Sequence, residues 1–183
     1  DVLYDFDGRK VPYHGDCIQG VMMEGTSKST DDVKSIDEAL KCVGAMRSAF
    51  KIASEELDVA EELGLAIGLA YGPVTLTGLG IKGQRDRCAL GRCVMESEKL
   101  QRECSGRQTQ VSKSLVDRAG NGAKALFEEG RLVNDLDYNL VCSTMTAVEG
   151  EKQDDASSGS GKALSAGFTP IIPKPFASRR VED

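Results

Sequence analysis

Tryptophan is absent from this chain, and histidine occurs once, at His14. The six cysteines are scattered, and no two of them form a CxxC pair. Structural zinc sites need closely spaced Cys and His residues, and disulfide frameworks belong to oxidising compartments. The sequence therefore favours neither kind of site, and we expect a protein of a reducing, cytoplasmic compartment.

Long apolar runs and long basic runs are also missing. No segment approaches the roughly 18 consecutive apolar residues that a membrane helix requires. Lys and Arg number 23 against 29 Asp and Glu, which gives a formal net charge of −6. We therefore expect neither a membrane partner nor a nucleic-acid partner. The length of 183 residues, with 40% hydrophobic residues, suits one globular domain with a real core.

The stretch from Lys10 to Glu24, KVPYHGDCIQGVMME, predicts a β-hairpin. Val11 begins a first short strand, residues 14–16 form a polar turn that contains a glycine, and Cys17–Met22 return as a second strand. Asp16 lies at the tip, where a rigidly held carboxylate suits a hard cation such as Mg²⁺ or Mn²⁺. The alternative, an ordinary aspartate in a turn, stays open at this point.

Hydrophobic periodicity predicts two main helices, Asp31–Leu57 with a break near Gly44, and Arg92–Glu103. Leu65–Gly72 alternates bulky with very small residues, which predicts a strand packed closely against another element. The remaining predicted elements are shorter. Val2–Phe6 is a strand, Ala66–Leu79 a hairpin, Cys88–Leu90 a buried strand, Gln108–Val111 a strand, Lys113–Ala119 a helix, and Tyr138–Ser143 an edge strand or helical turn.

This mixture predicts an α+β fold, with helices packed on a mainly antiparallel sheet. Residues 1–145 form the folded body. Residues 146–167 are acidic and then rich in Ser and Gly, which predicts a flexible linker. Residues 168–183 form an extended tail, because Pro170, Pro173 and Pro175 cannot lie in the middle of a sheet.

Four blocks within residues 8–115 together resemble the class III nucleotide cyclases, the adenylyl and guanylyl cyclase catalytic domain. They are the Gly15-Asp16 hairpin, the long helix from Asp31, LAIGLAYGPVTLTGLG (Leu65–Gly80), and RCALGRCVMESEKLQREC (Arg87–Cys104). The resemblance implies a ferredoxin-like cyclase fold. Three segments are most similar to the bacterial pyrimidine cyclases of the Pycsar antiphage system. They are YHGD (Tyr13–Asp16), KGQRD (Lys82–Asp86) and the Pro-rich tail.

The resemblance implies metal-dependent cyclisation of UTP, or of CTP, to a 3′,5′-cyclic nucleotide, a second messenger for antiphage defence. Two Mg²⁺ or Mn²⁺ ions would be held at each site, with Asp16 as one ligand. The other metal-binding aspartate of the family lies on a strand well upstream of the hairpin. We therefore expect the N-terminal part of the domain to be missing from this chain, and the isolated chain to be inactive.

The resemblance also assigns roles to individual residues. Tyr13 and Cys88 fall on base-recognition positions, although a surface aromatic and a small core residue are the simpler readings. The family's asparagine and arginine correspond to Met95 and Lys99, and Arg92 is a second candidate for contact with the triphosphate. The family implies a homodimer with sites at the interface. Two alternatives stay open: an inactive cyclase-homology module, and an ordinary adenylyl or guanylyl cyclase.

Overall fold

The computed structural model describes residues 2–11, 16–26, 28–60, 62–81, 84–128, 131–132 and 137–154. Most of the predicted linker and all of the predicted Pro-rich tail therefore lie outside the described residues. The final described element, helix α6 (Tyr138–Asp154), extends into the range from residue 146 that we predicted as linker.

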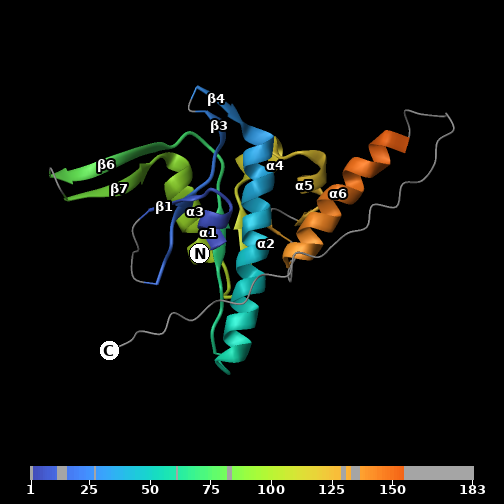
Figure 1. Cartoon of the computed structure of the whole chain (residues 1–183), viewed down its shortest axis with the longest axis horizontal. Helices are drawn as coiled ribbons and strands as arrows, with labels where there is room; N and C mark the ends of the chain where they lie inside the picture. The colour runs from blue at the N-terminus through green and yellow to red at the C-terminus, as the bar shows by residue number, and fades with distance from the viewer. Residues whose placement is uncertain are drawn as a thin grey trace, which may run out of the picture.

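Helices and strands are interspersed along the chain (Figure 1). The helices besides α6 are α1 (Val2–Asp5), α2 (Asp32–Glu56), α3 (Arg92–Glu103), α4 (Lys113–Arg118) and α5 (Asn121–Lys124). The strands are β1 (Arg9–Lys10), β2 (Gly20–Val21), β3 (Glu24–Thr26), β4 (Ser29–Asp31), β5 (Ile67–Leu69), β6 (Thr75–Ile81), β7 (Gln84–Leu90), β8 (Thr109–Val111), β9 (Phe127–Glu128) and β10 (Arg131–Leu132). The α+β class is confirmed.

The central sheet has four strands in the order β5-β8-β10-β9. Strand β5 runs parallel to β8, with Ile67 opposite Thr109 and Leu69 opposite Val111, whereas β10 is antiparallel to both β8 and β9. The other strands form antiparallel two-stranded ribbons, β1–β2, β3–β4 and β6–β7. The predicted Ala66–Leu79 hairpin is therefore wrong. The partner of β5 is β8, because the chain crosses over through β6, β7 and α3 and brings that distant strand alongside β5.

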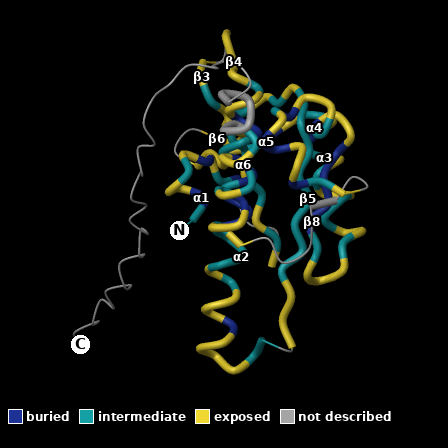
Figure 2. Tube along the Cα trace, turned by 90° about the vertical axis from the view of Figure 1, so that its right-hand side faces the viewer, coloured by how far each residue is buried: buried dark blue, intermediate teal, exposed yellow. Residues whose placement is uncertain are grey.

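One apolar core lies between the sheet and the helices. Three of its residues are fully buried: Leu40 of α2, Leu126 between α5 and β9, and Val141 of α6. Val111 of β8 and Leu115 of α4 pack with them. The last part of α2 extends beyond this core and is largely exposed (Figure 2). The core thus fixes the first half of α2 and the sheet relative to each other.

Helix α2 begins and ends within a residue of the prediction, and Asp31 caps it by accepting a hydrogen bond at Oδ1 from Lys34 N, 3.0 Å away. The predicted break near Gly44 is wrong, because the helix is continuous. A Cβ added at Gly44 would lie 3.0 Å from Tyr138 Cα and 3.1 Å from Val141 Cγ2. The glycine therefore allows α6 to approach α2 closely, and α6 itself replaces the edge strand or single turn predicted over Tyr138–Ser143.

The predicted strand Val2–Phe6 is also wrong, because this segment is the short helix α1. The chain folds back directly after it, and Gly8 N donates to Leu3 O at 2.8 Å. Leu3 is buried against the glycines of the following ribbon, where a Cβ at Gly8 would overlap the Leu3 side chain. Tertiary packing around Leu3 thus overrides the local strand preference.

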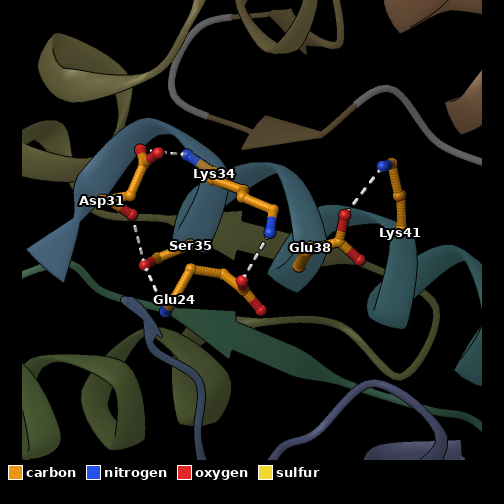
Figure 3. Close-up of polar contacts among 6 residues, drawn as sticks. All are labelled: Glu24, Asp31, Lys34, Ser35, Glu38 and Lys41. Atoms are coloured by element: carbon orange, nitrogen blue, oxygen red, sulfur yellow. Dashed lines mark hydrogen bonds and ion pairs between the residues drawn. The ribbon is translucent and has the colours of Figure 1, made fainter. Parts of the chain in front are cut away.

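Polar contacts tie the β3–β4 ribbon to the start of α2 (Figure 3). Glu24 N donates to Ser35 Oγ at 2.9 Å, and Ser35 Oγ donates to Asp31 O at 2.6 Å. Lys34 Nζ also forms an ion pair with Glu24, 2.7 Å long. The chain that leaves the β1–β2 ribbon is therefore held against α2 immediately afterwards.

Replacing Gly44 by valine should lower the free energy of unfolding by about 1–3 kcal/mol, because the added methyl groups would push against α6. Urea denaturation measures this difference. The matched control is Ala53→Val at an exposed position of the same helix, where helix propensity alone should cost less than about 1 kcal/mol. Equal effects at the two positions would contradict the packing role of Gly44.

Candidate functional site

An antiparallel ribbon is present where the hairpin around Asp16 was predicted, but its strands are shorter and lie further from Asp16, and residues 12–15, which include most of the predicted turn, lie outside the described residues. Arg9 lies opposite Val21, Lys10 lies opposite Gly20, and Val11 N donates to Gln19 O at 2.9 Å. Asp16 is exposed in the connection between β1 and β2. Tyr13, our candidate for base recognition, lies outside the described residues. The ribbon thus presents the Asp16 carboxyl group to solvent, where a ligand can reach it.

The second candidate for base recognition, Cys88, lies on the long arm formed by β6 and β7. This arm extends away from the body (Figure 1), and Cys88 is opposite Thr77 in its register. Cys88 is half-buried and Ala89 is buried, but Leu90 is 50% exposed. The predicted buried strand Cys88–Leu90 is therefore only the base of a longer, mainly exposed strand.

Helix α3 follows the arm directly and has the predicted bounds. Its inner face lies on β5 so closely that a Cβ at Gly68 would overlap Ser97 O. This contact confirms the predicted small face of that strand. Arg92 and Lys99, our two candidates for triphosphate contact, are seven positions apart and share the opposite, exposed face. Met95 is 72% exposed beside them.

Lys99 is only weakly paired on this face. Lys99 Nζ lies 3.7 Å from Glu103 Oε1, and the Lys99 side chain is 74% exposed. An exposed pair of this length contributes little to stability, so Lys99 is able to exchange Glu103 for an anionic ligand. The β7–α3 unit therefore places Cys88, Arg92 and Lys99 on consecutive elements, whereas Asp16 comes from the separate β1–β2 ribbon.

A two-metal site needs several oxygen ligands around the ions. In the part of the chain that the structure describes, no group of three or more His, Cys, Asp or Glu side chains could hold a metal ion. Asp16 therefore supplies a single carboxylate, and the described residues do not by themselves form a two-metal site.

A network that the sequence analysis missed joins α2, α4 and the end of β5. Arg118 Nε donates to Asp32 Oδ2 at 2.9 Å. Tyr71 N donates to Ser112 Oγ at 3.2 Å, and Ser114 Oγ donates to Tyr71 O at 2.8 Å. Tyr71 precedes the arm, so these bonds fix the point from which the arm leaves the body. Asp32 and Arg118 are 86 positions apart, and no local pattern could have indicated their pairing.

The same contacts shift the acid–base behaviour of the network. The hydrogen bond from Arg118, followed by that from Tyr71, lowers the pKa of the Asp32 carboxyl group. Burial, and then the neighbouring Asp32, raises the pKa of the Tyr71 hydroxyl group. Near neutral pH the network therefore contains a carboxylate, a guanidinium and a neutral phenol.

Two hollows among the described residues lie apart from these candidate residues. A cavity of about 240 Å³ lies between α2, α5 and α6, beside Val33, Asp37, Asn121 and Met145. A wider hollow lies at the tip of the arm, beside Leu79 and Arg85. Neither of these two hollows is lined by Asp16, Arg92 or Lys99.

Comparison with known proteins connects this geometry to one class. No protein-family model matches the chain. It is 39% identical over 180 residues to a uridylate cyclase of Pseudomonas aeruginosa, an alignment that covers 94% of this chain and 35% of that protein. It is 44% identical over 127 residues to a uridylate cyclase of a Rhizobium species, an alignment that covers 69% of this chain and 24% of that protein.

Solved structures give the same answer for the fold. A crystal structure of a class III adenylyl cyclase-like ATP-binding protein from Pseudomonas aeruginosa matches with a TM-score of 0.71 and 43% identity, and it covers 79% of this chain and 31% of that chain. The guanylyl cyclase Cya2 matches with a TM-score of 0.58 at 18% identity, which shows a shared fold alone. It covers 73% of this chain and 70% of that chain.

The chain has the fold of the class III nucleotide cyclases, as these structures show. It is similar in sequence to the two proteins named uridylate cyclase, and it spans about a third of the first (35%) and about a quarter of the second (24%). No helix among the described residues has the length and apolar character to cross a membrane.

Removal of the Arg118 charge should weaken the fold mainly above pH 4. The pKa of Asp32 is lowered in the folded protein, so its stabilising effect is present above the unfolded-state pKa and is lost as pH falls through the folded-state pKa. Urea midpoints of Arg118→Gln should therefore lie below those of the parent at pH 7 and approach them near pH 3. The control is Arg102→Gln on the exposed face of α3. A difference that stays constant with pH would contradict the assignment.

Proposed function

We propose that this chain serves, within its full-length protein, as catalytic-domain sequence of a pyrimidine nucleotide cyclase. The substrate is UTP, with CTP as the less favoured alternative, and the products are the 3′,5′-cyclic nucleotide and pyrophosphate. The observation that carries this proposal is the 39% identity, over 94% of the chain, to a protein named uridylate cyclase.

In this reaction the ribose 3′-oxygen attacks the α-phosphorus in line. The O3′–Pα bond forms, the bond from Pα to the bridging oxygen breaks, and the 3′-hydroxyl loses its proton. Phosphoryl transfer depends on positioning and on neutralisation of phosphate charge. Arg92 and Lys99 supply positive charge on the exposed face of α3. Lysine acts as a point charge, without the bidentate geometry of arginine, and Met95 offers no hydrogen bond to the ribose.

Two Mg²⁺ or Mn²⁺ ions would neutralise the triphosphate, and the exposed Asp16 is the ligand that this chain contributes. At least one more carboxylate must join Asp16, because a two-metal site needs more than one. Tyr13 is the residue that we assign to uracil, through stacking or a hydrogen bond from its phenol. Cys88, half-buried at the base of the arm, is the second base contact that we assign.

A homodimer with sites at the interface agrees with what is exposed. Large apolar side chains project from the arm and from the outer face of α3, including Ile81 at 72% and Met95 at 72% exposure. An isologous pair would cover them. The resemblance to Pycsar cyclases makes a cytoplasmic enzyme that produces a second messenger for antiphage defence the setting that we propose.

A catalytically inactive nucleotide-binding module is the second candidate. It is favoured by Met95, which stands where the family has a ribose-contacting asparagine. It is favoured also by the 43% identical structure, described as an adenylyl cyclase-like ATP-binding protein. An inactive module would bind a nucleoside triphosphate without releasing pyrophosphate.

Incubation of the full-length protein with each nucleoside triphosphate and Mn²⁺ tests the proposal. We expect cyclic UMP to be the main product, measured by liquid chromatography. Asp16→Ala should lower the rate by at least about 100-fold, as expected for loss of a group that stabilises transition-state charge. Asp117→Ala, at an exposed position of α4, is the matched control and should leave the rate unchanged.

The same panel separates the alternatives. Tyr13→Ala should lose the preference for uracil if the enzyme uses pyrimidines, and should change little in a purine cyclase. Binding of a triphosphate with no cyclic product from any base would favour the inactive module. Full activity of Asp16→Ala would overturn the role of that carboxylate.

A further inference from the structure

The inner face of α3 is lined by residues that bring the helix unusually close to β5. Cys93, Ser97, Gln101 and Cys104 follow one another at steps of four, four and three, so they share one face of the helix. In the middle of this face, a Cβ at Gly68 would overlap Ser97 O and lie 2.5 Å from Gln101 N. The α3 backbone therefore lies directly on the β5 backbone.

A thiol lies at each end of the contact. Near the start of α3, Cys93 Sγ donates to Pro73 O at 3.4 Å. After the last turn, Cys104 Sγ donates to Ile67 O at 3.3 Å. Cys104 also ends the helix, with its backbone N–H bonded to Gln101 O and Leu100 O. The two thiols thus contact carbonyls at the first residue of β5 and beyond its last residue.

Cys93 packs against two glycines that leave no room for side chains of their own. A Cβ at Gly72 would lie 3.1 Å from Cys93 Cβ, and one at Gly91 would lie 2.6 Å from Pro73 O and 3.5 Å from Cys93 Sγ. A thiol is a weak hydrogen-bond donor, so its size and direction matter more than the strength of its bond. A branched side chain at position 93 would have to move α3 or the Gly72-Pro73 segment.

Such a movement would reach the outer face of the same helix. Arg92 is adjacent to Cys93 in sequence, and Lys99 lies between the two thiols, both on the face turned away from β5. A helix of 12 residues moves as a unit over this length. A displacement of about 1 Å in a reacting group can lower a rate by about 100-fold.

We propose that Cys93 and Cys104 are positioning residues, which seat α3 on β5 and so set the place of Arg92 and Lys99 at the triphosphate. The effect on catalysis rests on the proposed function, whereas the role of the cysteines in holding α3 on β5 rests on the contacts described above. Neither cysteine touches the substrate. Their role is to be small, directed side chains at the two ends of a close helix–strand contact.

The test uses four variants of the full-length protein: Cys93→Val, Cys93→Ser, Cys104→Val, and the matched control Cys142→Val on the half-buried side of α6. For Cys93→Val we expect kcat with UTP to fall by about 100-fold while KM changes much less, since the shift misplaces groups during reaction. Cys93→Ser, similar in size and also a donor, should keep kcat within a few-fold of the parent, and Cys142→Val should match the parent.

Amide hydrogen exchange provides the readout that does not need activity. Cys93→Val and Cys104→Val should exchange faster in α3 while α2 keeps the parental protection. If Cys93→Val does not fold, Cys104→Val, at a half-buried position, decides the matter in the same two measurements. Parental kcat together with parental α3 exchange in the folded valine variants would overturn the proposal. So would a Cys93→Ser variant as impaired as Cys93→Val.

Failure of the proposed function would look different. A parent protein that forms no cyclic nucleotide from any triphosphate refutes the cyclase assignment. In that case, faster exchange confined to α3 would still support the seating role, and unchanged exchange would refute it as well.

Discussion

The contact on which this structure most depends is the direct approach of α3 to β5 at Gly68. A Cβ there would overlap Ser97 O, so the helix can rest on the strand only because that residue has no side chain. The parallel pairing of β5 with β8, and the hydrogen bond from Ser112 N to Leu69 O, then fix the strand to the core. As a result, one face of α3 is fixed, and the opposite face, with Arg92 and Lys99, has a defined position at the surface.

The other parts of the candidate site depend on separate ties to the same body. The arm that carries Cys88 leaves from Tyr71, whose backbone is bonded to Ser112 and Ser114. The β1–β2 ribbon that carries Asp16 continues into a segment bonded to α2 through Glu24 and Ser35. The proposed base contact and phosphate-binding charges therefore lie on the consecutive β7 and α3, and the proposed metal ligand Asp16 lies in a separate ribbon with its own tie to the body. This arrangement suits a reaction whose catalysis is mainly positioning and charge neutralisation.

The features that could be predicted from the sequence are those that depend on local residue patterns. Helices α2 and α3 were predicted to within a residue because hydrophobic periodicity defines them, and the small face of β5 was predicted from Gly68 and its neighbours. Pairing over long distances could not be predicted. Strand β5 pairs with β8 and not with the adjacent β6, α1 forms because Leu3 is buried against Gly8, and Asp32 meets Arg118 across 86 positions. Cys88, Arg92 and Lys99, which the family resemblance assigns to the site, lie on the consecutive elements β7 and α3, whereas their relation to Asp16 depends on tertiary structure.

The most direct test of the account is a crystal structure of the full-length protein with Mn²⁺ and 3′-deoxy-UTP, which lacks the attacking hydroxyl group. The account predicts that the triphosphate contacts Arg92 or Lys99 on the outer face of α3, with the Asp16 carboxylate bound to a metal ion and α3 still resting on Gly68. A triphosphate bound away from α3, with Asp16 free of metal, would contradict it.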